Sequence, residues 1–138
     1  MSPLAVGHRF ADTPLAILSA QDVAAYAEAS GDHNPIHLDE QAARAAGLPG
    51  TIVHGMLIMG RLEGAIRGWL PQARLARLST RFVKPLTVGD GIAIGGRVVR
   101  VRPLEDGGSE LLLRLTIANG DGAPVCIGEA ALHLDAEA

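Results

Sequence analysis

The sequence predicts an α+β fold in which an antiparallel β-sheet wraps around one long helix. Two observations carry this prediction. Apolar residues follow a helical period up to about Leu70 and change to a strand-like pattern after about Arg74. The second half then divides into consecutive strands joined by turn sequences, and helices followed by strands are typical of the α+β class. The 138 residues fit a single domain, 1–138.

The first half contains start and stop residues for three helices. They are expected over residues 19–30, 39–46 and 54–70. Ser19 is suited to cap the first helix, and Gly47 to end the second. Between these two helices, Pro35 keeps the preceding residue out of the helical region, so residues 31–37 are expected to form a turn of defined shape.

The second half is expected to form four strands. They cover residues 74–84, 91–102, 109–118 and 124–134. The sequence Asn-Gly-Asp-Gly at 119–122 favours a hairpin between the last two strands. Gly95 and Gly96 predict a β-bulge in the second strand, and residues 4–10 are a candidate edge strand.

Three glycines recur every four residues on the longest predicted helix, at Gly60, Gly64 and Gly68. Each costs about 1 kcal/mol relative to alanine inside a helix, so the stripe needs a reason. Close packing of this face against the sheet is the favoured interpretation. The alternative is that the stripe leaves room for a thin ligand such as an acyl chain.

Composition excludes several classes of protein. A net charge of -3, from 12 Lys+Arg and 15 Asp+Glu, does not favour a dedicated nucleic-acid binder. The longest apolar-rich stretch, 52–70, is interrupted by charged residues, so no membrane span is expected. The N-terminus lacks the pattern of a signal peptide. The single cysteine, Cys126, is expected to be a buried, reduced thiol in a cytoplasmic protein.

The stretch SGDHNPIHLD, residues 30–39, concentrates titratable groups between two apolar helices. Asp32 and His37 lie five residues apart on a turn fixed by Pro35, so they can converge as a pair of proton-transfer groups. The alternative is structural: Asp32 caps a helix that begins near Pro35, and His37 is a satisfied side chain. These residues alone leave both interpretations open.

A second group of interest is His54-Gly55-Met56, at the start of the longest helix. A glycine there exposes backbone N–H groups at the positive end of the helix dipole, which suits an oxygen that gains negative charge during a reaction. The alternative is an ordinary N-terminal glycine. A metal site at His33 and His37 is not favoured, because Pro35 interrupts the helix that would align them.

Basic residues recur along the predicted strands, at Arg74, Arg77, Arg81, Lys84, Arg97, Arg100 and Arg102. Strand alternation places Arg77 with Arg81 on one face, and Arg100 with Arg102 on one face. A solvated sheet surface is the simpler interpretation. The alternative is that some of these residues hold the phosphates of coenzyme A or contact an acidic carrier protein.

Taken together, YAEASGDHNPIH (residues 26–37), an alanine at position 43 and IVHGML (residues 52–57) resemble the MaoC-like hydratases and dehydratases. The stretch SGDHNPIH followed by IVHGMLIMG is especially similar to the mycobacterial-type hydroxyacyl-thioester dehydratase subunit. The resemblance covers about residues 4–134. It implies the hot-dog fold, a sheet wrapped around a central helix, and a homodimer or higher homo-oligomer, with a heterodimer as the alternative.

The resemblance also implies a reaction and its residues. The reaction is the reversible syn addition of water to a trans-2-enoyl thioester, giving an (R)-3-hydroxyacyl thioester carried by coenzyme A or acyl carrier protein. Asp32 and His37 are the implied catalytic pair, and Asn34 orients the site. Gly55, through its N–H, and His54 are implied to form the site that binds the thioester oxygen. No metal or redox cofactor is implied.

One position departs from the family pattern. R-specific hydratases carry a supporting serine on the central helix where this chain has Glu63. An ion pair between Glu63 and Arg67, four residues apart, is the favoured interpretation. Two rival functions stay open: a hot-dog acyl-CoA thioesterase that uses Glu63, and an acyl-binding subunit of a heterodimeric dehydratase. Retention of both Asp32 and His37 argues against the second.

Overall fold

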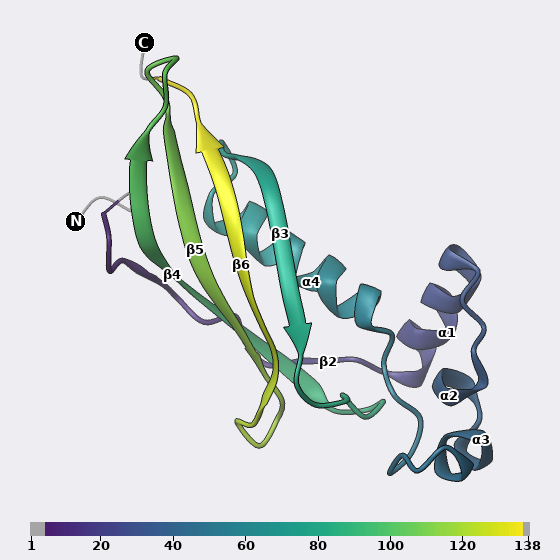
Figure 1. Cartoon of the computed structure of the whole chain (residues 1–138). Helices are drawn as coiled ribbons and strands as arrows, with labels where there is room; N and C mark the ends of the chain where they lie inside the picture. The colour runs from purple at the N-terminus through teal and green to yellow at the C-terminus, as the bar shows by residue number, and fades with distance from the viewer. Residues whose placement is uncertain (1–4, 137–138) are drawn as a thin grey trace.

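The computed structural model describes residues 5–136, which form one antiparallel sheet and four helices. The strands are β1 (Arg9–Phe10), β2 (Ala16–Ile17), β3 (Arg74–Phe82), β4 (Gly91–Pro103), β5 (Ser109–Ala118) and β6 (Pro124–Leu134). Their order across the sheet is β1-β4-β5-β6-β3, and β2 pairs separately with β4. The sheet curves around the long helix α4 (Gly55–Trp69), as the hot-dog prediction required (Figure 1).

The three remaining helices are α1 (Ala20–Ser30), α2 (Pro35–Leu38) and α3 (Glu40–Ala45). They gather beyond the N-terminal end of α4, away from the sheet (Figure 1). We call this region, residues 20–45, the helical lobe. No helix within residues 5–136 is long and apolar enough to cross a membrane.

The core lies between α4 and the inner face of the sheet. Ile58, Leu62 and Ile66 follow the i, i+4 spacing of one helix face and are each no more than 2% exposed. They share one buried cluster with alternate residues of β5, from Leu111 to Ile117. Full burial of such a side chain stabilises the fold by about 1.5–3 kcal/mol. Cys126 also belongs to this cluster, and burial raises the pKa of its thiol.

The helix boundaries confirm most of the expected capping. The Ser19 side chain accepts from the N–H of Asp22, and the Asp22 carboxylate accepts from the N–H of Ser19, which completes a capping box. The predicted turn at 31–37 is wrong in one respect: residues 35–38 form the short helix α2. Pro35 fixes its first φ angle, which favours helix entry and shortens the turn.

The predicted packing of the glycine stripe is wrong. Gly60, Gly64 and Gly68 are exposed on the side of α4 away from its buried stripe, and a Cβ atom added at any of them would meet nothing within 4 Å. Close approach occurs instead at Gly96 on β4, where a Cβ would lie 2.8 Å from the Trp69 ring. The glycine that packing requires therefore lies on the sheet rather than on the helix.

The predicted bulge is also displaced. Gly95 and Gly96 pair regularly with Thr116 and Leu115, and the register shifts between Val98 and Arg100 instead. A glycine is required at position 96 because the Trp69 ring packs against it, and not because the strand bulges there. The predicted edge strand reduces to Arg9–Phe10 within the described residues, and residue 4 lies outside them. The second short strand, Ala16–Ile17, was not predicted.

Candidate active site

The turn between α1 and α2 is built from local hydrogen bonds. Gly31 ends α1 with a φ of 79°, a conformation that favours glycine. The Asp32 N–H donates to Ser30 Oγ at 3.1 Å, and Asp32 Oδ1 accepts from the Asn34 N–H at 3.2 Å. Asn34 in turn caps α2 through the Ile36 N–H at 3.2 Å. Asn34, rather than Asp32, is therefore the cap of this helix, and Asp32 Oδ2 stays outside these turn bonds.

His37 projects from α2 towards the start of α4. Its Nδ1 lies 2.7 Å from the backbone oxygen of Ile52, which can only accept, so Nδ1 carries the proton. The lone pair of Nε2 is then available, and this atom lies 3.9 Å from Asp32 Oδ2. That separation is too long for a direct hydrogen bond but leaves space for a bridging water. The His37 side chain is 9% exposed, whereas that of Asp32 is 52% exposed.

His54 lies beneath this pair. Its ring stacks on the His37 ring with centroids 3.8 Å apart, and the Tyr26 ring lies tilted against it at 4.8 Å. The residue is 1% exposed. Its Nε2–H donates to the backbone oxygen of Asp32 at 3.0 Å. Its Nδ1 is buried and has no hydrogen-bond partner among residues 5–136, so a proton on that atom would lack an acceptor. His54 therefore ties together the backbone of Asp32 and the ring of His37.

Gly55 begins α4 and borders a hollow of about 340 Å³. The first N–H groups of α4 have no acceptor within the helix, so they can donate hydrogen bonds to an oxygen of a ligand. A Cβ at Gly55 would lie 3.1 Å from the Phe82 ring, so a side chain here would narrow the hollow. The hollow is lined by Ile52, Val53, Gly55, Ile58, Phe82, Val83, Lys84, Pro85 and Leu86. Most of these side chains are apolar, which suits an acyl group.

Residues 5–111 match the family model described as MaoC like domain. The chain belongs to the MaoC-like family. A solved relative, described as the (R)-hydratase from A. caviae involved in PHA biosynthesis, is 32% identical, with a TM-score of 0.83 and coverage of 95% of this chain and 97% of that one.

Two curated relatives illustrate the range of the family. The (R)-specific enoyl-CoA hydratase of Aeromonas caviae is 35% identical over 117 residues, covering 83% of this MaoC-like chain and 85% of the relative. The mitochondrial 3-hydroxyacyl-[acyl-carrier-protein] dehydratase of Arabidopsis thaliana is 40% identical over 76 residues, covering 55% of this chain. The chain aligns with only 46% of that relative's length.

Glu63 of the MaoC-like chain forms the ion pair that the sequence favoured. Its Oε1 lies 2.7 Å from Nη2 of Arg67, one turn further along α4. Eight residues separate Glu63 from Gly55, which corresponds to about 12 Å along a helix axis. Glu63 is therefore distant from the Gly55 N–H groups of its own chain and already holds a partner.

The site contains the ligand types of a metal centre but not its geometry. Candidate atoms of Asp32, His37 and His54 lie within 4.8 Å of one another. The two imidazole planes are inclined by only 25°, so their in-plane lone pairs run side by side instead of converging on one point. His33 is turned away and bonds Glu28 at 3.0 Å, a contact that raises the pKa of His33.

Two features of the site were not assigned from sequence. The stacking of His54 on His37 joins the N-cap of α4 to α2, and the Tyr26 ring of α1 lies tilted against His54. Tyr26 stands within the sequence motif, so its position alone could have suggested a role. The partner of His54 could not be inferred, because it depends on how α4 meets the helical lobe.

Proposed function

We propose that the chain catalyses the reversible hydration of trans-2-enoyl thioesters to (R)-3-hydroxyacyl thioesters, or the reverse dehydration, in fatty-acid metabolism. One observation carries the proposal. An available imidazole nitrogen of His37 and a carboxylate oxygen of Asp32 lie 3.9 Å apart near the N-terminus of α4. A base and an acid beside an oxyanion site are what addition of water to an enoyl thioester requires. The names of the relatives described above agree with this reaction.

In the hydration direction, His37 Nε2 removes a proton from water as the water oxygen bonds to Cβ. The electron pair of the Cα–Cβ double bond moves towards the thioester oxygen and forms an enolate. The Gly55 N–H and the dipole of α4 stabilise that charge. The proton held on His37 Nε2 then passes by way of the Asp32 carboxylate to Cα, which restores the thioester and returns both side chains to their starting protonation states. Because one pair handles both additions, hydroxyl and hydrogen enter from the same face.

Asn34 and His54 have supporting roles in this proposal. Asn34 caps α2 and so orients the helix turn that carries His37. His54 packs under the His37 ring and holds the Asp32 backbone, which makes it a positioning residue. The near-parallel imidazole rings favour proton transfer by side chains over a shared metal ion. The proposed reaction needs no redox cofactor, because water addition changes no net oxidation state.

We propose that the active form is a homodimer or higher homo-oligomer, with a heterodimer as the alternative. Strand β3 ends the order of strands in the sheet and is nine residues long. One side of β3 therefore offers backbone groups that a second chain could pair with. Light scattering of the purified chain, alone and with candidate partner chains, would separate these assemblies.

The test of the reaction follows loss of enoyl-thioester absorbance with trans-2-enoyl-CoAs of increasing length. Asp32→Asn should reduce the rate at least about 100-fold, within the range attributed to a general acid–base group. Asp121→Asn, in the loop after β5, is the matched control and should retain the wild-type rate. A thiol reagent in the same assay detects hydrolysis by a thioesterase. Thiol release without hydration would contradict the proposal and direct attention to Glu63.

A further inference from the structure

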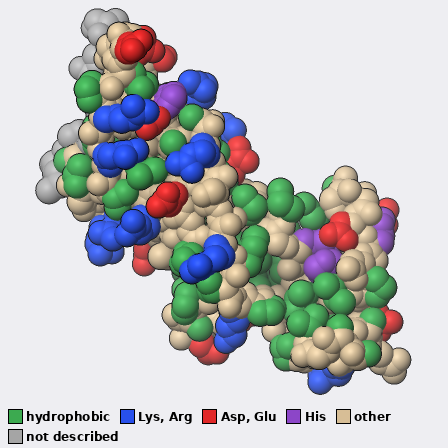
Figure 2. Space-filling model, in the orientation of Figure 1, with side chains coloured by type: hydrophobic (Ala, Val, Ile, Leu, Met, Phe, Trp, Pro, Cys, Tyr) green, Lys and Arg blue, Asp and Glu red, His purple; other side chains and the backbone are tan. Residues whose placement is uncertain are grey.

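The outer face of the sheet, opposite α4, concentrates the positive charge of the chain. Figure 2 shows most of the visible Lys and Arg side chains gathered over the strands, with a few Asp and Glu side chains among them. The pairing registers place eight of the chain's 12 cationic residues on this side; we call these the arginine face: Arg9, Arg74, Arg77, Arg81, Arg97, Arg100, Arg102 and Arg114. The chain as a whole carries a net charge of -3. Two carboxylates, Glu110 and Glu129, lie on the same face, and Glu110 pairs with Arg100 and Arg102. The face is therefore strongly but not purely basic, and most of the chain's carboxylates lie elsewhere.

One row of this face brings like charges together. Arg9 is opposite Arg97, and Arg97 is opposite Arg114, on three neighbouring strands; the row continues to Glu129 of β6, opposite Arg114. Strands lie about 4.8 Å apart, and like charges directly opposite destabilise a sheet. None of these three arginines forms an ion pair with the residues that the structure describes, 5–136. The arrangement costs stability in the isolated chain, and an anionic partner would offset that cost.

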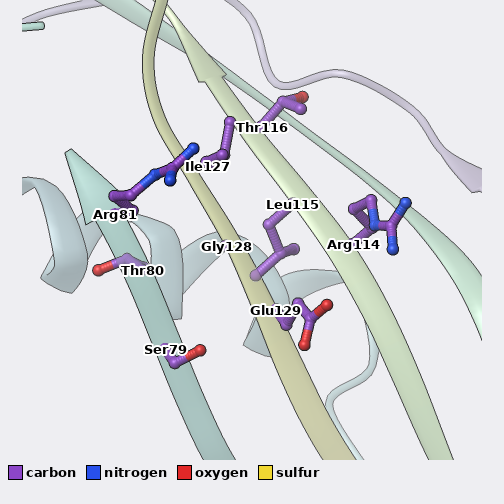
Figure 3. A pocket seen from close by; sticks show the side chains of 9 residues that line it. All are labelled: Ser79, Thr80, Arg81, Arg114, Leu115, Thr116, Ile127, Gly128 and Glu129. Carbon is purple, nitrogen blue, oxygen red and sulfur yellow. The ribbon is translucent and has the colours of Figure 1, made fainter. Parts of the chain in front are cut away.

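The chemistry of the face suits a protein partner. All eight cations are arginine, and protein interfaces are enriched in arginine and depleted in lysine. Figure 3 shows Arg81 and Arg114 on either side of β6, around a hollow of about 460 Å³ that Ile127 and the carboxylate of Glu129 also line. A second hollow, of about 660 Å³, lies on the other side of Arg114 and includes Arg9, Arg97 and the carboxylate of Asp12. Guanidinium groups match carboxylates bidentately, so acidic side chains would fit here.

The arginine face also leads to the proposed active site. Arg77 and Arg81 lie on β3, which ends at Phe82. Phe82 borders the hollow beside Gly55, and Lys84 lines the same hollow. The charged residues are spread over four strands, and rows along a strand repeat every 7 Å or so. This spread exceeds what the few phosphates of one nucleotide would contact.

We propose that the arginine face docks an acidic protein that carries the enoyl group on a flexible thioester arm and delivers it to the hollow beside Gly55. This inference rests on the proposed function, and it assigns the carrier as a protein rather than free coenzyme A. Carboxylates of the carrier contact Arg77, Arg81 and the Arg9–Arg97–Arg114 row. The arm then passes the end of β3 to reach the Gly55 N–H.

The test compares the but-2-enoyl group on acyl carrier protein with the same group on coenzyme A. The measured quantity is the ratio of kcat/KM for the two substrates. Arg77→Gln/Arg81→Gln should lower this ratio about tenfold, equivalent to weakening the carrier complex by about 1.4 kcal/mol. The control, Arg61→Gln/Arg67→Gln, removes the same charge from α4 and should keep the ratio. Added salt should lower the ratio for the unaltered chain, because it screens exposed charges.

Three results would overturn the inference. The first is a kcat/KM ratio for Arg77→Gln/Arg81→Gln that stays within twofold of the ratio for the unaltered chain. If coenzyme A substrates are still hydrated, this result would overturn the docking of a carrier protein but leave the proposed function intact. The second is a smaller assembly in light scattering for that variant, which would assign the face to contacts between copies of this chain. The third is no turnover of either thioester by the unaltered chain, which would overturn the proposed function as well. Urea unfolding of each variant verifies that it is folded.

Discussion

The helical lobe and the sheet differ in charge and in the interactions that hold them together. The lobe carries five carboxylates and only Arg44 as a cation, and its turns are held by short-range hydrogen bonds. The sheet encloses an aliphatic core with α4 and carries the arginines outside. The difference indicates that the stability of the fold resides mainly between the sheet and α4, while the proposed catalytic pair lies in the lobe. Substitutions in the sheet core should therefore mainly change stability, and substitutions at the proposed site should mainly change catalysis.

The largest effect on stability is expected in the core of the sheet. Leu113 is 0% exposed on β5, so Leu113→Ala should lower the free energy of unfolding by about 2–5 kcal/mol. Leu112, its neighbour, points to the outer face and provides a matched control. Leu112→Ala should cost about 1 kcal/mol or less. Equal losses for the two variants in urea unfolding would contradict the assignment of faces.

His54 should affect catalysis more than stability, because it links the two members of the pair. His54→Phe keeps a ring beneath His37 but removes the bond to the Asp32 backbone, and His54→Gln keeps an amide donor but removes the ring. Each should lower kcat by about 10- to 100-fold, since small displacements of catalytic groups are costly. KM should change little. A rise in KM with an unchanged kcat would show that His54 contacts substrate instead.

Two glycines should respond to alanine in opposite directions. Gly64 is exposed on α4 with no neighbour for a Cβ, so Gly64→Ala should raise the free energy of unfolding by about 0.5–1 kcal/mol. Gly96→Ala should lower it, because the new atom would meet the Trp69 ring. Thermal or urea unfolding measures both. Destabilisation by Gly64→Ala would show that another chain covers this side of α4.

The smallest effect is expected at Glu110, and it should depend on pH. Hydrogen bonds from Arg102 and His133 lower the pKa of Glu110 to about 2. A carboxyl group with a lowered pKa stabilises the fold above its ordinary pKa of 4.5, and this contribution is lost as the pH falls from there towards 2. Glu110→Gln should therefore be less stable than the unaltered chain at pH 7. The difference should shrink at pH 3, as urea midpoints at several pH values would reveal.

The sequence contains enough local information for most of the fold. The capping box at Ser19 and Asp22 depends on residues three apart, and the last two strands flank a turn sequence, so both follow from neighbouring residues. The glycines of α4 and β4 were misassigned, because a missing side chain has several causes that only the packing partner distinguishes. For Gly96 that partner is Trp69, 27 residues away.

In the candidate site, too, local features could be predicted from the sequence and long-range contacts could not. Asp32 and His37 could be paired from sequence, because five residues and a proline limit their separation. The cluster of the Tyr26, His54 and His37 rings could not be inferred, since three parts of the chain contribute to it. In the SGDHNPIHLD stretch, the interpretation in which Asp32 caps the helix is wrong. Asn34 performs the capping, which leaves Asp32 Oδ2 and His37 Nε2 facing each other.

The most direct test of the central claim measures whether Asp32 and His37 act as one unit. Hydration rates of but-2-enoyl-CoA would be compared for Asp32→Asn, His37→Gln and the double variant. If the pair transfers protons together, the double variant should be about as slow as the slower single variant, because residues that act as a unit are strongly non-additive. Rate losses that multiply in the double variant would contradict the account and assign the two residues independent roles.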